Sequence, residues 1–214
     1  MRYDFRYYKS GRLISLIILL AVVTVPTFAK LSRFLESSVS IVTPSVVALV
    51  PASVLVGFTL WVIEIHLWNN PWVNYFLIEI PDVSGRYIGE SVSKDSGPNS
   101  RDVISDVVVE ISQTASKINI KMFHRPKEVD REYVSQTLVA EIIDENGSYH
   151  IQAIYQIRQG PHIDNKIDLA GVLGSCRLDY IEPTKEFKID YFNEKRNTGY
   201  MDVEFQTKKL KQKF

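Results

Sequence analysis

Two long uncharged segments near the start of the chain constrain its fold more than any other feature. Residues 13–29 (LISLIILLAVVTVPTFA) and 41–63 (IVTPSVVALVPASVLVGFTLWVI) contain no Asp, Glu, Lys or Arg. At about 1.5 Å per helical residue the first spans roughly 26 Å, and the second is long enough to cross a ~30 Å hydrocarbon core with some tilt. Pro44 and Pro51 are tolerable inside a membrane helix. The sequence therefore predicts a membrane domain, residues 1–71, with two transmembrane helices.

The distribution of basic residues predicts how these helices are oriented. Four basic residues precede the first apolar segment, namely Arg2, Arg6, Lys9 and Arg12. Basic flanks stay on the cytoplasmic side, so we expect a cytoplasmic N-terminus, an outward link at residues 30–40 and a second helix that returns the chain to the cytoplasm. The alternative interpretation of residues 13–29 is a cleaved signal peptide, which leaves the second helix with the same orientation.

The remainder of the chain has the pattern of a small all-β domain. From about residue 83 the apolar side chains recur with a period of two, which is the signature of half-buried strands. We predict eight strands, at residues 83–93, 103–112, 117–124, 133–144, 148–158, 169–181, 187–193 and 199–207. Such a series favours an antiparallel up-and-down, lipocalin-like barrel over residues 72–207, with a β-sandwich as the alternative. Residues 208–214 carry four lysines and are predicted to be a frayed, solvated basic tail, with a position near anionic lipid as the alternative.

The polar half contains no recognisable catalytic motif, and we expect a protein that is not an enzyme and that uses no metal or cofactor. Phosphate-binding loops, paired-histidine zinc motifs and nucleophile elbows are all missing from the sequence. Lys plus Arg equals Asp plus Glu, so the net charge is zero, which argues against binding of DNA or RNA. A small anionic ligand needs only a few local cations and is not excluded.

Two motifs behind the helix pair make the chain similar to one known family. Residues 80–89 (IPDVSGRYIG) open the barrel and residues 191–199 (YFNEKRNTG) precede the last strand. This order resembles the effectors of bacterial cyclic-oligonucleotide antiphage systems (CBASS) that have two N-terminal transmembrane helices and a β-barrel. Two features depart from that family: Tyr87 stands where the family more often has Trp, and the closing motif is compressed.

The resemblance implies a function for each half of the chain. The barrel would bind a cyclic dinucleotide made by a partner synthase, and binding would promote self-association of the chain. The clustered helices would then disrupt the bacterial inner membrane and kill the infected cell. The resemblance thus implies a multi-pass inner-membrane protein whose partners are the nucleotide, the bilayer and further copies of itself.

Five residues in the opening and closing motifs are predicted to bind the nucleotide. Arginine pairs with phosphates and tyrosine offers a face on which a base can stack. The first and last strands are neighbours in a closed barrel, so we expect these residues to converge. The predicted ligand-binding residues are Arg86, Tyr87, Tyr191, Arg196 and Thr198.

Two other functions remain open at this point. A membrane-tethered, lipocalin-like barrel could bind an apolar ligand, and would then have an apolar interior. An enzyme that modifies lipid at the membrane surface would instead cluster titratable side chains at one barrel mouth.

Overall fold

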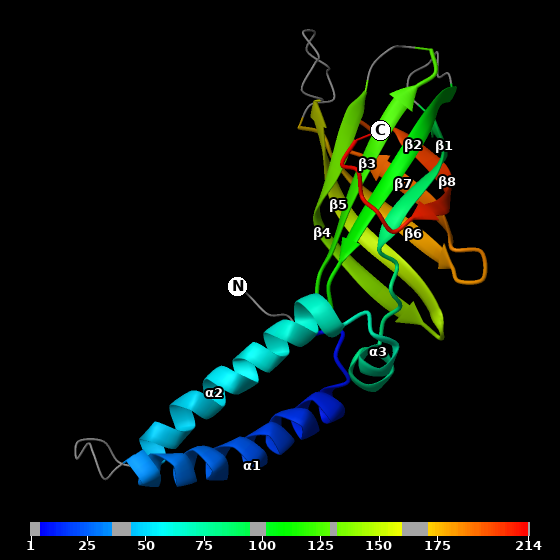
Figure 1. Ribbon diagram of the computed structural model, residues 1–214. Coiled ribbons are helices and arrows are strands. Elements are labelled where there is room, and N and C mark those ends of the chain that lie inside the picture. Colours follow the sequence, from blue (N-terminus) through cyan, green and yellow to red (C-terminus); the bar gives the residue numbers. More distant parts are fainter. Residues whose placement is uncertain (1–4, 36–43, 95–101, 129–131, 160–170, 214) are drawn as a thin grey trace. The chain divides into compact units, whose positions relative to one another are not determined.

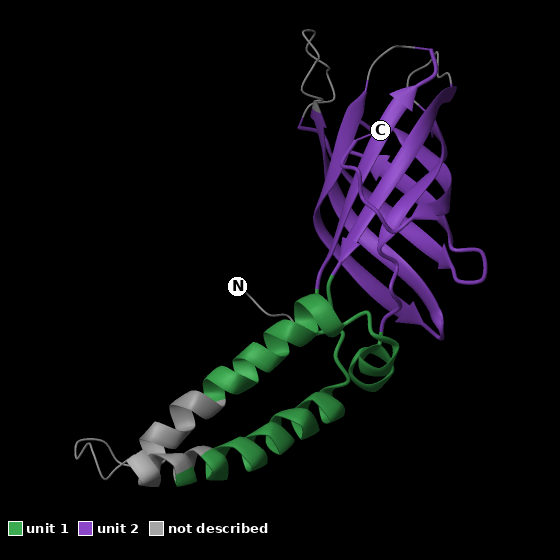
Figure 2. Ribbon diagram, in the orientation of Figure 1, with its two compact units in different colours: residues 1–79, 114–116 green, residues 80–113, 117–214 purple. Residues whose placement is uncertain are grey.

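The computed structural model describes residues 5–35, 44–94, 102–128, 132–159 and 171–213. It divides into two compact units, which Figure 2 shows in different colours. Residues 1–79 and 114–116 form a helical unit, and residues 80–113 and 117–214 form a β unit. The chain therefore passes between the two units after residues 79, 113 and 116.

The helical unit begins with two apolar helices. They are α1 (Ser10–Leu35) and α2 (Pro44–Val62), followed by one π-helical turn (Ile63–Leu67). Among the described residues, only the window Ser10–Thr27 in α1 is both long and apolar enough to cross a membrane. The structure thus supports one candidate span where the sequence predicted two.

Part of the second predicted segment lies outside the described residues. Residues 41–43 lie outside the described part of the chain, and α2 starts at Pro44. Proline is favoured in the first turn of a helix, where its missing N–H has no helical partner. The apolar helical run described beyond it, Ser53–Leu67, is shorter than the α1 window.

A short helix that the sequence analysis missed completes the helical unit. This helix, α3 (Pro71–Leu77), starts with the Asn70 side chain accepting a hydrogen bond from the amide of Trp72 at 3.0 Å. At its other end, Lys9 donates to the carbonyl of Tyr75 at 2.8 Å, and Arg12 donates to the same carbonyl and to that of Phe76, each at 3.1 Å. Cations are favourable at a helix C-terminus, so these basic residues tie the start of α1 to α3.

A buried carboxylate organises the junction of the helical unit. Glu64, in the π-helical turn, is 5% exposed and accepts a hydrogen bond from the Tyr8 hydroxyl at 3.0 Å. Its other oxygen accepts from the Thr114 hydroxyl at 2.6 Å and from the Ser116 amide at 3.1 Å and hydroxyl at 2.5 Å. The carboxylate therefore joins three distant parts of the chain, including residues 114–116.

The β unit is a closed barrel of eight antiparallel strands, as Figure 1 shows. The strands are β1 (Gly85–Lys94), β2 (Asp102–Gln113), β3 (Ile118–Pro126), β4 (Tyr133–Glu145), β5 (Ser148–Gln159), β6 (Leu173–Ile181), β7 (Glu186–Asn193) and β8 (Thr198–Thr207). Each pairs with its neighbours in sequence and β1 pairs with β8, which confirms the predicted barrel. The turn between β4 and β5 has positive φ at Asn146 (56°) and Gly147 (87°), as a tight hairpin requires.

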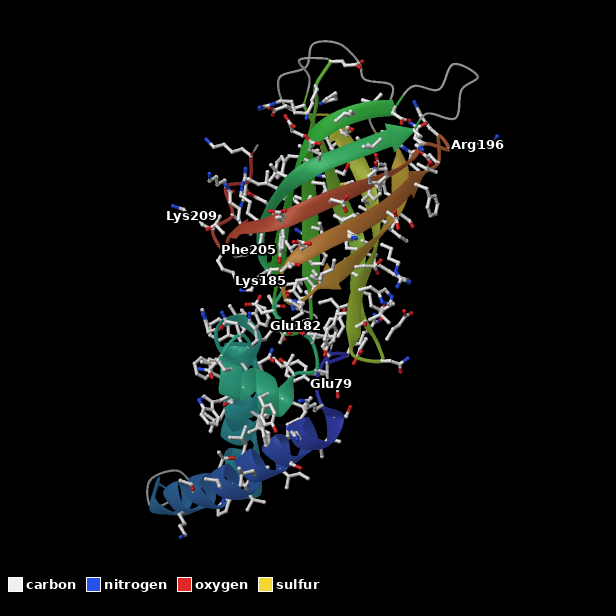
Figure 3. The ribbon with its side chains drawn as sticks, turned by 90° about the vertical axis from the view of Figure 1, so that its right-hand side faces the viewer. Glu79, Glu182, Lys185, Arg196, Phe205 and Lys209 are labelled. Atoms are coloured by element: carbon white, nitrogen blue, oxygen red, sulfur yellow. The ribbon has the colours of Figure 1, made fainter. Side chains whose placement is uncertain are left out.

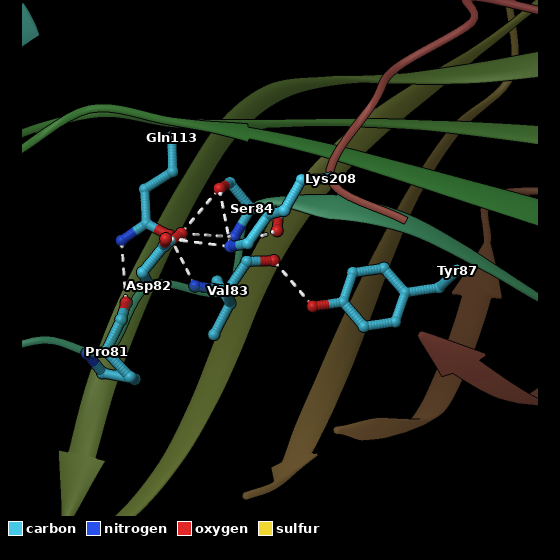
Figure 4. A network of polar contacts seen from close by, with 7 residues as sticks. All are labelled: Pro81, Asp82, Val83, Ser84, Tyr87, Gln113 and Lys208. Atoms are coloured by element: carbon cyan, nitrogen blue, oxygen red, sulfur yellow. Dashed lines mark hydrogen bonds and ion pairs between the residues drawn. The ribbon is translucent and has the colours of Figure 1, made fainter. Parts of the chain in front are cut away.

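A hydrogen-bonded segment leads into the barrel, as Figure 4 shows. The Gln113 side chain accepts from the amide of Val83 at 2.9 Å and donates to the carbonyl of Pro81 at 2.9 Å. The Tyr87 hydroxyl donates to the carbonyl of Val83 at 2.8 Å. Lys208 donates to Asp82 at 2.8 Å. The bonds of Gln113 and Tyr87 satisfy backbone groups of this irregular segment, and Lys208 adds a contact between side chains.

Most residues of the basic tail are exposed, as in a solvated end, but the tail also bonds to the barrel. Besides the contact of Lys208 with Asp82, the amides of Lys211 and Gln212 donate to the Glu110 carboxylate at 2.8 and 3.0 Å. Residues 208–213 therefore fold back and are held on the barrel. The lysine composition alone did not indicate these bonds, because two of them are made by main-chain amides and the third depends on where Asp82 lies in the fold.

Candidate ligand site

The structure does not bring the five predicted ligand-binding residues together. Strands β1 and β8 are neighbours, as expected, but they run antiparallel, so that Arg86 lies opposite Thr207 and Lys94 opposite Thr198. Eight residues of extended strand separate the two pairs, about 26 Å at 3.3 Å per residue. Figure 3 shows Arg196 at the opposite end of the barrel from Phe205, the register partner of Tyr87. The expected convergence is therefore wrong.

Arg86 and Tyr87 have structural partners at the start of β1. Arg86 is 3% exposed; its guanidinium lies 2.6 Å from the Glu110 carboxylate and donates to the Lys213 carbonyl at 2.7 Å. Tyr87 is 1% exposed and packs edge-to-face on Phe187, with ring centroids 5.0 Å apart. Burial raises the pKa of Tyr87 well above its usual range. In this structure neither side chain presents a surface to a ligand.

The other end of the barrel contains a cavity, which we call the mouth chamber. It lies inside the barrel where β1, β3, β5 and β7 end and β4 and β8 begin, and has an unfilled volume of about 40 Å³. Its walls are mainly aromatic and uncharged polar side chains, including Ser93, His124, Tyr133, Ser135, Tyr155, Tyr191, Asn193 and Asn197. Of the five predicted residues, Tyr191 alone lines it.

Two glycines in the barrel wall make room for tyrosine rings of the chamber. A Cβ on Gly174 would lie 2.3 Å from the ring of Tyr155, and one on Gly199 would lie 2.4 Å from the hydroxyl of Tyr191. Either would clash, so only glycine permits these rings to lie against the wall. The Tyr191 hydroxyl also shares a hydrogen bond with Ser93. The positions of the two rings therefore depend on small residues of other strands.

The chamber is electrically neutral at physiological pH. His124 is 4% exposed, and burial lowers its pKa to about 4, so the imidazole is uncharged. Burial raises the pKa of Tyr133 to about 12 and moves that of Tyr155 upward as well. His124 stacks on Tyr133, with centroids 4.7 Å apart and an angle of 8° between the rings. Its Nδ1 has no hydrogen-bond partner among the described residues.

The buried imidazole predicts an acid-sensitive fold. The pKa of His124 in the folded state is about 4, below the ordinary 6.5, so the unfolded chain takes up the proton first as pH falls. Neutral, buried His124 therefore contributes fully to the free energy of unfolding above pH 6.5. This contribution falls by about 3 kcal/mol between pH 6.5 and pH 4, at 1.36 kcal/mol per pKa unit. Urea unfolding of the full chain at several pH values should show a flatter profile in His124→Phe than in the wild type. Parallel profiles for the two proteins would contradict this assignment.

A larger hollow on the barrel exterior is less suited to an anionic ligand. It measures about 640 Å³, and its lining includes Glu141, Ile154, Arg177, Asp190, Phe192 and Thr198. The described lining contains one cation, Arg177, which is already 2.8 Å from Asp179 and 3.4 Å from Glu145. An anion there would also meet two carboxylates. We therefore favour the mouth chamber, although Thr198 borders the exterior hollow instead.

Sequence reasoning overlooked several chamber residues for an identifiable reason. Tyr155 and His124 were not among the predicted ligand-binding residues, because they belong to neither the opening nor the closing motif. One signal was available in the sequence. Inward-facing residues near the ends of β1, β3, β5 and β7 and near the starts of β4 and β8 all lie at the same end of an up-and-down barrel. No group of three or more His, Cys, Asp or Glu side chains suited to a metal occurs in the described parts of the chain.

Comparison with known protein families agrees with a nucleotide-binding barrel. Residues 78–204 match the family described as "Cap15, cyclic dinucleotide receptor domain". The match covers β1 to β7 and most of β8, which is more than half of the chain. No curated protein sequence is significantly similar. With its eight-stranded barrel and N-terminal apolar helix, the chain belongs to the Cap15 family of CBASS effectors, whose barrel is a cyclic dinucleotide receptor.

Proposed function

We propose that this protein converts a cyclic dinucleotide signal into disruption of the bacterial inner membrane. A synthase that responds to phage supplies the nucleotide, the barrel binds it, and the bound chains self-associate until the membrane fails and the infected cell dies. The observation that carries the proposal is the joining of a receptor-family barrel to the apolar helix α1 in one chain.

The proposed membrane domain comprises residues 1–71, with α2 as a second span. In its support, residues 41–63 are uncharged and α1 and α2 contact each other. The basic residues before α1 favour a cytoplasmic N-terminus, and two spans would leave the receptor domain, residues 72–207, in the cytoplasm with the nucleotide.

Signal transfer is proposed to use the turn between β2 and β3. Residues 114–116 belong to the helical unit through their hydrogen bonds to Glu64, while the flanking strands are part of the barrel wall. A change in the barrel that moves β2 or β3 would therefore also move residues 114–116 and their hydrogen bonds to Glu64. The ligand can drive assembly only if it binds the assembled form better than the isolated chain.

Reconstitution of the full chain tests this function. The protein is placed in vesicles of phosphatidylethanolamine and phosphatidylglycerol loaded with a self-quenched dye. Cyclic di-AMP, cyclic di-GMP, cyclic di-UMP and cyclic GMP–AMP are then added separately. We expect dye release with at least one of them and none without nucleotide, and the nucleotide should be recovered chemically intact. Binding without release would overturn the membrane output, and consumption of the nucleotide would favour an enzyme.

A further inference from the structure

We propose that the mouth chamber receives one nucleobase of the cyclic dinucleotide, that both phosphates remain outside it, and that His124 hydrogen-bonds the base. This inference rests on the proposed function and adds the binding mode. It concerns residues that lie in β3, β4, β5 and β7 and that carry no recognised nucleotide-binding motif.

The size of the chamber limits what can enter. Its unfilled volume of about 40 Å³ corresponds to room for about three or four water molecules. At about 30 Å³ of liquid volume per water molecule this is roughly 100 Å³, which suits one pyrimidine-sized ring and is much less than a whole cyclic dinucleotide with its two sugars and two phosphates. A single base is therefore the part of the ligand that the chamber can hold.

The polarity of the chamber also selects the base over the phosphates. The described lining contains no Lys or Arg, and a phosphate buried without a cation would pay a large desolvation cost. A base is uncharged, and its flat faces can stack on the rings of Tyr133, Tyr155 or Tyr191. Cations are instead found on the outer surface at the same end of the barrel, where Lys94 and Arg158 are exposed near the ends of their strands.

His124 is the chamber group that most clearly lacks a partner. Its ring is buried in the wall, yet Nδ1 has no hydrogen bond in the described structure. Buried polar atoms are nearly always paired in folded proteins, so an unpaired one on a residue that lines a cavity is a candidate partner for a ligand. The unpartnered nitrogen of a neutral imidazole can donate or accept one hydrogen bond, and the edge of a base offers partners of both kinds. By contrast, Asn193 already accepts from the amides of Lys195 and Asn197.

The test measures affinity and stability together in the full chain in detergent micelles, with the four cyclic dinucleotides named above as probes. His124→Phe keeps a ring that can stack on Tyr133 but removes both nitrogens. We expect it to weaken binding by about tenfold, the equivalent of one hydrogen bond, while the melting temperature without ligand stays equal or rises. If His124 were purely structural, its replacement would lower the nucleotide affinity and also the melting temperature without ligand.

A matched control exists in the same barrel. His150 is also buried and its Nε2 is likewise unpartnered, but it does not line the chamber. His150→Phe should leave affinity unchanged. A second variant, Ser135→Leu, places bulk in the chamber and should abolish binding. Should that variant fail to fold, competition by the free nucleosides uridine, adenosine and guanosine replaces it: the matching nucleoside should displace the probe, and inorganic phosphate should not.

The outcomes separate this inference from the proposed function. If the wild type binds none of the probes, the receptor function fails and the inference fails with it. If the wild type binds but His124→Phe binds equally well, or phosphate competes and no nucleoside does, the receptor stands and the base-in-chamber inference is overturned.

Discussion

Glu110→Ala is expected to lower the free energy of unfolding by about 3–5 kcal/mol, a large part of the ~5–15 kcal/mol that holds a typical domain folded. The side chains of Arg86 and Glu110 are only 4% and 3% exposed, so removal of the carboxylate leaves a buried guanidinium without its counter-charge. The amides of Lys211 and Gln212 lose their acceptor at the same time, which should release the tail. Urea unfolding of the full chain measures the first effect and limited proteolysis of the tail the second.

The double variant Arg86→Met/Glu110→Leu separates the pair from its members. Replacement of both charges by apolar groups is often close to neutral, so we expect most of the lost stability to return. The control is Glu90→Ala, which removes an exposed partner of Lys127 and should change stability by about 1 kcal/mol or less. If Glu110→Ala behaves like Glu90→Ala, the buried pair is not important to the fold. Normal nucleotide binding by the double variant would remove Arg86 from the candidate ligand residues.

Gly89→Ala is expected to prevent normal closure of the barrel, at a cost of about 4 kcal/mol or more. A Cβ at this position would lie 1.8 Å from the carbonyl oxygen of Asp202 and 2.9 Å from the Cα of Val203. Both atoms belong to the backbone of β8, which cannot move away without breaking the ladder between β1 and β8. The side chain is absent because the two strands cross closely at this point.

The measurement for Gly89→Ala is a thermal melt of the full chain followed by the circular dichroism of its β-sheet. The matched control is Ile88→Ala, one residue earlier on the same strand, where the side chain is 38% exposed and faces outward. That variant should melt within a few degrees of the wild type. A cooperative melt of Gly89→Ala at the same temperature would show that β1 and β8 can separate locally without loss of the barrel.

The strand positions were predictable because the alternation of apolar and polar side chains can be recognised within a short stretch of sequence. Seven of the eight strands begin within two residues of their predicted starts, and β6 begins at Leu173 after a segment that lies partly outside the described chain. The hairpin at Asn146 and Gly147 was equally predictable, since two positive φ values favour these residue types. The choice between barrel and sandwich was open, because it depends on the pairing of β1 with β8, more than 100 residues away.

The candidate site was predicted poorly because it depends on strand direction and on what covers each side chain. Arg86 reads as an available cation in the sequence, but the folded-back tail and Glu110 bury it. Tyr191 reads as one stacking residue among several, and only the closed barrel places it beside Tyr155 and His124. Residue type thus indicated the kind of ligand. The surroundings of each side chain in the barrel could not be predicted, because they are formed by segments that are distant in the sequence.

By itself the sequence determined an apolar N-terminal region, eight alternating strands, a neutral charge balance and the resemblance to CBASS effectors, since each of these can be recognised in short stretches of chain. Tertiary structure alone decided that the barrel closes, that residues 114–116 belong with the helices through Glu64, and that the chamber forms at the mouth opposite Arg86. The physical reason is the range of the interactions. Periodicity records which face of a strand is buried, but strand register, burial of Arg86 and the chamber arise from contacts between segments that are far apart in the chain.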